Sequence, residues 1–175
     1  MTTSTMKYVL LLRGINVGHA KRIAMAQLRS ICEELGCRNV RTVLQSGNVI
    51  FTAAAPPSRR RLQEALLATV GFSADVLTVP EAQFRAIADD DPLLGRTTDP
   101  ARHIVTFFQS RIDPRTIEIP QALEPELLEL SSDAAYQWLP DGVLQTKLPR
   151  DFWASLPTAV TARNRRTVDK LLTLL

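Results

Sequence analysis

The chain has 175 residues, of which 45% are hydrophobic and 22% are charged, values typical of a globular protein and not of a disordered one. Its formal net charge of +3 permits anionic partners without requiring them. The longest early apolar run, residues 8–12, is too short to span a bilayer and has no basic leader or small-residue cleavage site. We therefore expect a cytoplasmic protein with no membrane partner.

The first half of the chain alternates strand-like and helix-like segments. Strands are predicted at residues 6–13, 39–45, 49–52 and 74–79, and amphipathic helices at 24–35 and 58–70. Gly36 and Gly71 follow the helices, at the position where glycine commonly ends a helix. The order strand, helix, strand, strand, helix, strand predicts a ferredoxin-like split βαβ subdomain in residues 1–80.

The second half contains shorter segments and no sequence repeat. We expect a short helix opening at Pro80, which with a polar loop to Pro100 makes residues 81–100 a helical and loop connection, and then a strand at 103–109. A short helix is predicted at 124–131, a hairpin from 135–139 and 143–147, a helical turn at 151–155 and a helix from about residue 164. These segments predict an α+β protein in which residues 101–175 form a second, smaller α+β subdomain.

Cysteine and histidine are too few to suggest a metal centre. Cys32 falls on the apolar face of the helix predicted at 24–35, and Cys37 follows the glycine that ends it. A reduced, packed Cys32 is the favoured interpretation, since disulfides are rare in the cytosol. His19 and His103 complete no zinc-binding spacing with these cysteines, so no metal is expected.

Three stretches of the chain are similar to the signatures of one protein family. They are residues 8–18 (YVLLLRGINVG), 41–51 (RTVLQSGNVIF) and a C-terminal group of 161–164 (TARN), 167–168 (TV) and 170–171 (KL). The chain thereby resembles the uncharacterised bacterial family called domain of unknown function sixteen-ninety-seven. The resemblance implies a two-subdomain α+β fold and no established activity.

The chain departs from the pattern of that family in two places. Residues 19–22 (HAKR) stand where the family usually has a second glycine and a Lys-Asn-like pair. Arg165 and Arg166 stand where an aromatic and a small polar residue are typical. Any ligand contact that the family assigns to that aromatic residue is therefore not expected here.

The loop that follows the first strand is the leading candidate for a binding site. Arg13 lies at the end of the strand, Gly14, Asn16 and Gly18 form the loop, and Lys21 and Arg22 precede the helix. A flexible loop with cations before a helix N-terminus can present amides and positive charge to a phosphate or carboxylate. Alternatively, the glycines only make the turn, and Arg13 ties it to a neighbouring carbonyl or carboxylate.

The turn predicted at residues 45–48 is the second candidate. The amides of Gln45 and Asn48 offer both donors and acceptors for a base or amide edge, with Ser46 between them. Ser46 lacks the strand-to-helix context of a hydrolase nucleophile. The favoured alternative is ordinary turn chemistry, in which Asn48 bonds its own backbone.

The third candidate is a basic group near the C-terminus. Lys147, Arg163 and Asn164 match family positions, and Arg165, Arg166 and Lys170 add charge. For Arg165 and Arg166 we favour a solvated surface or a pair with the acidic run at residues 89–91, which lacks the spacing of a calcium loop. For Arg163 we favour an anion or a structural ion pair.

Three functions are compatible with these residues. The first is binding of a small phosphate- or carboxylate-bearing ligand between the two subdomains, with or without a reaction, and it predicts that the basic candidates converge. The second is a homo-oligomeric interaction module. The third and least favoured is nucleic-acid binding, because sheet surfaces that bind RNA carry stacking aromatics and the strands here offer only Tyr8 and Phe51. No catalytic residue and no cofactor can be named from the sequence.

Overall fold

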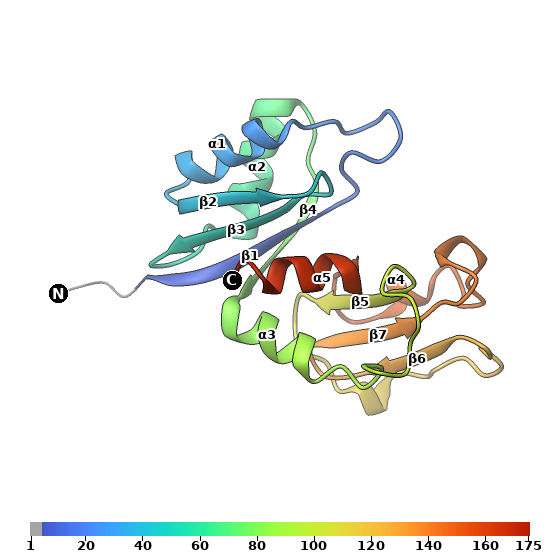
Figure 1. The fold of residues 1–175 in the computed structure, drawn as a ribbon. Helices are drawn as coiled ribbons and strands as arrows, with labels where there is room; N and C mark the ends of the chain where they lie inside the picture. Colours follow the sequence, from blue (N-terminus) through green and yellow to red (C-terminus); the bar gives the residue numbers. More distant parts are fainter. Residues whose placement is uncertain (1–4) are drawn as a thin grey trace. The chain divides into compact units, whose positions relative to one another are not determined.

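The computed structural model describes residues 5–175 and divides them into two compact units (Figure 1). Unit 1 runs to Arg85 and also contains Thr173–Leu175, whereas unit 2 comprises Ala86–Leu172. The division falls inside helix α3 (Glu81–Asp89), so residues 86–100 belong to unit 2. No helix in the described part of the chain has the length and apolar character needed to cross a membrane.

Unit 1 is built on a four-stranded antiparallel sheet. Its strands are β1 (Met6–Arg13), β2 (Arg38–Val43), β3 (Asn48–Ala53) and β4 (Asp75–Pro80), in the order β2-β3-β1-β4. Helices α1 (Met25–Glu34) and α2 (Arg59–Val70) form the two crossovers and lie on one face of the sheet (Figure 1). This strand order and connectivity are those of the ferredoxin-like fold, as the sequence predicts.

Alternation along the strands gives unit 1 two apolar sheet faces. Leu10, Leu12 and Phe51 belong to the core cluster that also contains Leu28 of α1 and Leu66 of α2. The alternate positions of β1, β3 and β4 point to the opposite face of the sheet. They are also apolar and buried, namely Val9, Leu11, Ile50, Leu77 and Val79. A strand that buries both faces has a continuous run of apolar residues in its sequence, and β1 has this pattern.

Unit 2 contains a second antiparallel sheet with the same relative strand order. Its strands are β5 (His103–Phe108), β6 (Leu127–Leu130), β7 (Ala134–Trp138) and β8 (Val160–Asn164), in the order β6-β7-β5-β8. Counted from the first strand of each unit, both sheets have the order second, third, first, fourth. The structure therefore repeats a topology that the sequence does not reveal as a repeat.

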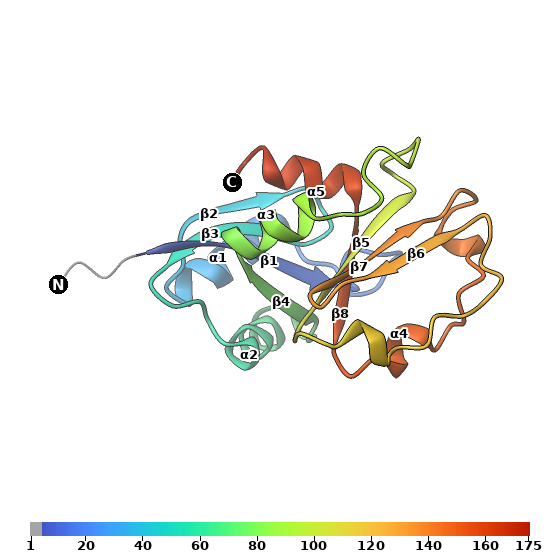
Figure 2. The ribbon, with the colours of Figure 1, turned by 90° about the horizontal axis from the view of Figure 1, so that it is seen from below.

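The connections of unit 2 differ from those of unit 1. Its crossovers carry only the 3-10 turns η1 (Pro114–Thr116) and η2 (Val143–Gln145) and the short helix α4 (Phe152–Ser155). Figure 2 shows α4 on one side of the sheet and α3 and α5 (Arg165–Leu172) on the other.

Two local predictions for unit 2 are wrong, and one strand was missed. Residues 127–130 form strand β6 and not a helix, because the segment between Pro125 and Ser131 is too short for a stable helix and gains hydrogen bonds by pairing with β7. Residues 143–147 do not return as a strand, and β7 instead pairs with β6 and β5. Strand β8 was not predicted, since its residues alternate only weakly in hydrophobicity.

Candidate functional site

The loop after β1 is held in a defined conformation by Asn16. Gly14, Asn16, Gly18 and Lys21 all have positive φ, at 72°, 52°, 61° and 50°. The side-chain amide of Asn16 donates to the carbonyls of Ile23, at 3.0 Å, and Gln45, at 2.8 Å, and its oxygen accepts the Ile23 N–H at 2.9 Å. Asn16 thus uses its side chain to close the loop, and asparagine is among the few residues that tolerate this φ.

The turn between β2 and β3 packs against the same loop. Gly47 has φ of 79°, and a Cβ at this position would lie 2.7 Å from Cδ1 of Ile15 and 2.8 Å from Cβ of Leu12. The Gly47 carbonyl also accepts the Leu12 N–H at 2.8 Å. Two stretches far apart in sequence, residues 13–23 and 44–48, therefore form one structural feature, which we name the loop–turn element.

Asn48 lies inside the turn and uses its side chain there. It is completely buried, and its amide donates to the Val43 carbonyl at 2.9 Å and to the Ser46 hydroxyl at 3.0 Å. The Gln45 carbonyl receives Asn16, while the Gln45 side chain is exposed. Asn48 thus makes local contacts across the turn, while a ligand contact at Gln45, Ser46 or Asn48 stays a prediction.

The cations of the loop–turn element are exposed. Arg13, Lys21 and Arg22 are exposed, as is His19. The Lys21 ammonium lies 3.3 Å from the Ser73 carbonyl, a long hydrogen bond that leaves its charge uncompensated. No acidic residue occurs in the sequence before Glu33, so the loop contributes positive charge alone.

Charge is divided unevenly between the two units. Unit 1 contains eleven Lys and Arg against five Asp and Glu, a formal +6, whereas unit 2 contains ten against thirteen, a formal −3. Four cations of unit 1 form ion pairs, with Asp75, Glu64 and Glu81 as their partners. The remaining seven have no carboxylate partner in the described part of the chain: Arg13, Lys21, Arg22, Arg29, Arg38, Arg41 and Arg61. Because the charges of the two units have opposite signs, the net charge of +3 for the whole chain is smaller than that of unit 1.

The helix that follows the loop leaves its N-terminus open. Ala24 is the N-cap of α1 and has no side-chain oxygen to accept from the first turn. The Gln27 side chain accepts the Ala24 N–H at 3.2 Å, and the first turn contains no acidic residue. Unsatisfied N–H groups and the helix dipole favour an anion at such an end.

The three C-terminal candidates belong to unit 2. The Lys147 ammonium donates to the Glu124 carbonyl, and its backbone N–H donates to buried Glu126 at 2.6 Å. Asn164 accepts the Thr167 N–H at 2.9 Å and so caps α5. Arg163 is half-buried, and burial lowers the pKa of its guanidinium to about 10. Lys147 and Asn164 thus have local structural roles, and a ligand contact at any of the three stays a prediction.

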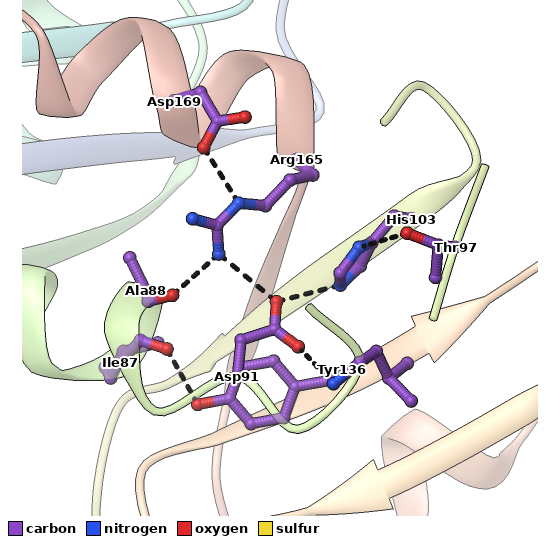
Figure 3. Close-up of polar contacts among 9 residues, drawn as sticks. Ile87, Ala88, Asp91, Thr97, His103, Tyr136, Arg165 and Asp169 are labelled. Carbon is purple, nitrogen blue, oxygen red and sulfur yellow. Dashed lines mark hydrogen bonds and ion pairs between the residues drawn. The ribbon is translucent and has the colours of Figure 1, made fainter. Parts of the chain in front are cut away.

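A buried charged network in unit 2 was only partly foreseen (Figure 3). The Asp91 carboxylate lies 3.2 Å from the Arg165 guanidinium and 2.8 Å from Nε2 of His103, and it accepts the Leu93 N–H at 2.9 Å. The His103 contact has ion-pair distance without hydrogen-bond alignment. The predicted alternative of a pair between Arg165 and the acidic run is confirmed, whereas the part of His103 was missed. His103 shares its strand face with Val105 and Phe107, a spacing that could have indicated a buried histidine.

The same network fixes the end of α3 to the sheet and to α5. Arg165 also donates to the Ala88 carbonyl at 2.7 Å and to Asp169 at 2.8 Å. The Tyr136 hydroxyl donates to the Ile87 carbonyl at 2.9 Å, and burial raises the pKa of Tyr136 to about 12. The Asp91 side chain is 0% exposed and those of His103 and Arg165 only 2% and 10%. A substrate cannot reach these groups, so we assign the network to stability and not to catalysis.

Two other kinds of site, a metal centre and a charged pocket, find little support among the described residues. No group of three or more His, Cys, Asp or Glu within residues 5–175 is arranged to hold a metal ion. A hollow of about 530 Å³ in unit 1 is bordered by Lys7 and Arg85, but Glu81 pairs with both. Glu81 thereby offsets one of the two positive charges at this hollow, and both cations are already paired.

Comparisons with known proteins agree with the fold. A solved structure described as a conserved bacterial protein of Streptococcus pneumoniae matches with a TM-score of 0.70 and 26% identity, covering 98% of this chain and 99% of that one. No curated protein matches. The family model described as "Protein of unknown function (DUF1697)" matches residues 6–136, and the chain belongs to this family.

Proposed function

We propose that unit 1 binds a small anionic ligand, carrying a phosphate or carboxylate group, at the loop–turn element. The observation that carries the proposal is the exposed set Arg13, Lys21 and Arg22, which has no carboxylate partner and stands on a loop that Asn16 holds in place. A loop fixed before binding loses less conformational entropy when a ligand arrives. Guanidinium groups also match the geometry of carboxylate and phosphate oxygens.

The helix that follows the loop adds to this argument. The open N-terminus of α1 supplies backbone N–H groups in the same stretch of chain as the cations. The exposed side chain of Gln45 offers a donor and an acceptor from the facing turn. The proposal therefore concerns an anion-binding surface made by one unit, and it requires no catalytic residue.

A thermal-shift panel on the purified protein tests the proposal. It contains inorganic phosphate, sugar phosphates, nucleotides, carboxylates, divalent metals and short RNA, and it is repeated on Arg13→Ala and on Arg61→Ala. Arg61 is the matched control, an exposed cation of α2 without a carboxylate partner. A ligand at a hundred times its Kd adds about 2.7 kcal/mol, which raises the midpoint by several degrees.

The two variants separate the outcomes of this panel. A shift with one chemical class that is lost in Arg13→Ala and kept in Arg61→Ala supports the proposal. A flat panel, or a shift that both variants lose equally, contradicts it, because the response then comes from overall charge.

A second candidate, assembly with another protein chain, is favoured by an exposed apolar tip in unit 2. Leu144 is 96% exposed and Val143 is 57% exposed on the same short turn. Sedimentation velocity of the wild type and of Leu144→Ser tests this alternative. A monomer that is unchanged by the substitution excludes self-association through this tip.

Nucleic-acid binding is the weakest candidate on the structure. Tyr8 and Phe51 stack on each other with ring centroids 5.4 Å apart, and both are buried, at 3% and 1% exposure. Aromatic side chains inside the core cannot stack on bases. Binding to RNA would therefore depend on charge alone and would weaken steeply with added salt.

A further inference from the structure

The end of helix α1 brings the two cysteines of the chain together. Leu35 is the C-cap residue, and Gly36 follows it with φ of 91°. The Gly36 N–H donates to the Glu33 carbonyl at 2.9 Å, and the Cys37 N–H donates to the Cys32 carbonyl at 3.0 Å. These two hydrogen bonds define a Schellman motif, whose first and last residues commonly place their side chains in contact. Here those residues are Cys32 and Cys37.

Both thiols are free and enclosed in the core cluster of unit 1. Cys32 is 0% exposed and Cys37 is 5% exposed. The interaction between the two thiols lowers the pKa of Cys37 and raises that of Cys32. Burial raises the pKa of Cys32 further. Cys37 is therefore the first of the two to form a thiolate, and thiolate is the nucleophilic form of cysteine.

We propose that Cys32 and Cys37 form a redox-active dithiol, which closes to an intramolecular disulfide by exchange with a small-molecule disulfide. The Cys37 thiolate attacks one sulfur of the oxidant, and the S–S bond of the oxidant breaks to release one thiolate. The Cys32 thiol then loses its proton and attacks the Cys37 sulfur of the mixed disulfide, which releases the second thiolate. The protein loses two protons and two electrons, and the oxidant leaves as two thiols.

Because both thiols are buried, the proposed reaction requires local opening of the segment around them. The pair lies where α1 ends, and helix ends open at a lower free-energy cost than the middle of a helix. Cys37 also lies directly before the exposed Arg38, the first residue of the edge strand β2. A purely structural pair of packed thiols would instead be inert and stay reduced until the unit unfolds.

The test uses the full-length native protein, oxidised glutathione as the oxidant, and intact-mass measurement over time. We expect the wild type to lose two hydrogens and to regain them with dithiothreitol. Cys32→Ser should accumulate one glutathione on Cys37, because no resolving thiol remains, whereas Cys37→Ser should react much more slowly. If Cys32→Ser does not fold, Cys32→Ala keeps an apolar side chain at this site and serves the same purpose.

Two results would overturn the proposal. One is a wild type that keeps both thiols while the urea-unfolded protein oxidises under the same conditions. The other is equal reaction rates of the two single-cysteine variants, which would show that neither thiol is the preferred nucleophile.

Discussion

Replacing Arg165 by methionine should strongly destabilise unit 2. The substitution keeps most of the apolar stem and removes the guanidinium that faces Asp91, the Ala88 carbonyl and Asp169. Asp91 then keeps the Leu93 N–H and the contact with His103, but its negative charge remains in a site with 0% side-chain exposure. Removing one partner of a buried ion pair costs about 3–5 kcal/mol, since the other charge is left uncompensated.

Urea unfolding followed by tryptophan fluorescence isolates this effect. The two tryptophans of the chain, Trp138 and Trp153, both belong to unit 2, so their signal reports that unit. With a slope of about 1–3 kcal/mol per M, Arg165→Met should lower the urea midpoint by roughly 1 M or more. Arg166→Met is the matched control, because Arg166 is exposed and lies 3.8 Å from exposed Asp99. It should change stability by less than about 1 kcal/mol.

A double-mutant cycle with Asp91→Asn completes the test. The combined variant removes both charges, so its loss should be smaller than the sum of the two single losses by about 1 kcal/mol or more. Additive losses, or an Arg165→Met protein as stable as the Arg166→Met control, would refute the conclusion that this pair stabilises unit 2.

Three further predictions concern single side chains. Gly47→Ala should lower the free energy of unfolding by about 1–3 kcal/mol, because its Cβ would lie 2.7 Å from Ile15. Gly14→Ala is the control, because a Cβ there meets open space, and it should cost less. Equal losses of thermal stability in the two variants would contradict this prediction. Asn16→Ala should cost about 1–3 kcal/mol and speed hydrogen exchange at Ile23, whose N–H it bonds. With its pKa raised to about 12, folded Tyr136 keeps its proton while the unfolded tyrosine loses it near pH 10, so stability should fall between pH 10 and 12. Tyr136→Phe should lack this fall, and an unchanged pH profile would show that Tyr136 is not its source.

Much of unit 1 could be predicted from sequence because its signals are local. The apolar run of β1, the helical spacing that ends at Gly36, and the turn at residues 46–48 depend on periodicity and backbone preference within a few residues. Strand β1 lies within its predicted bounds of residues 6–13. The ferredoxin-like order then followed from the sequence of elements alone.

The elements of unit 2 were harder to predict from the sequence, for a physical reason. Strand β6 has four residues and β8 five, and each is stabilised by pairing with distant segments and not by local propensity. The segment at 143–147 resembles a strand in composition, yet no neighbouring strand is available to it. Whether such a short segment forms a strand depends on the neighbouring strands with which it can pair.

The candidate sites also combine features set by the local sequence with features set by tertiary packing. The sequence by itself determined the family, the fold class and the basic character of the loop after β1, because these depend on residue identity and local order. Only the tertiary structure showed that Asn16 and Gly47 join two distant stretches into one element, and that Asp91, His103 and Arg165 meet in the interior of unit 2. Contacts between residues far apart in sequence depend on how the elements pack, and no local pattern in the chain specifies that packing.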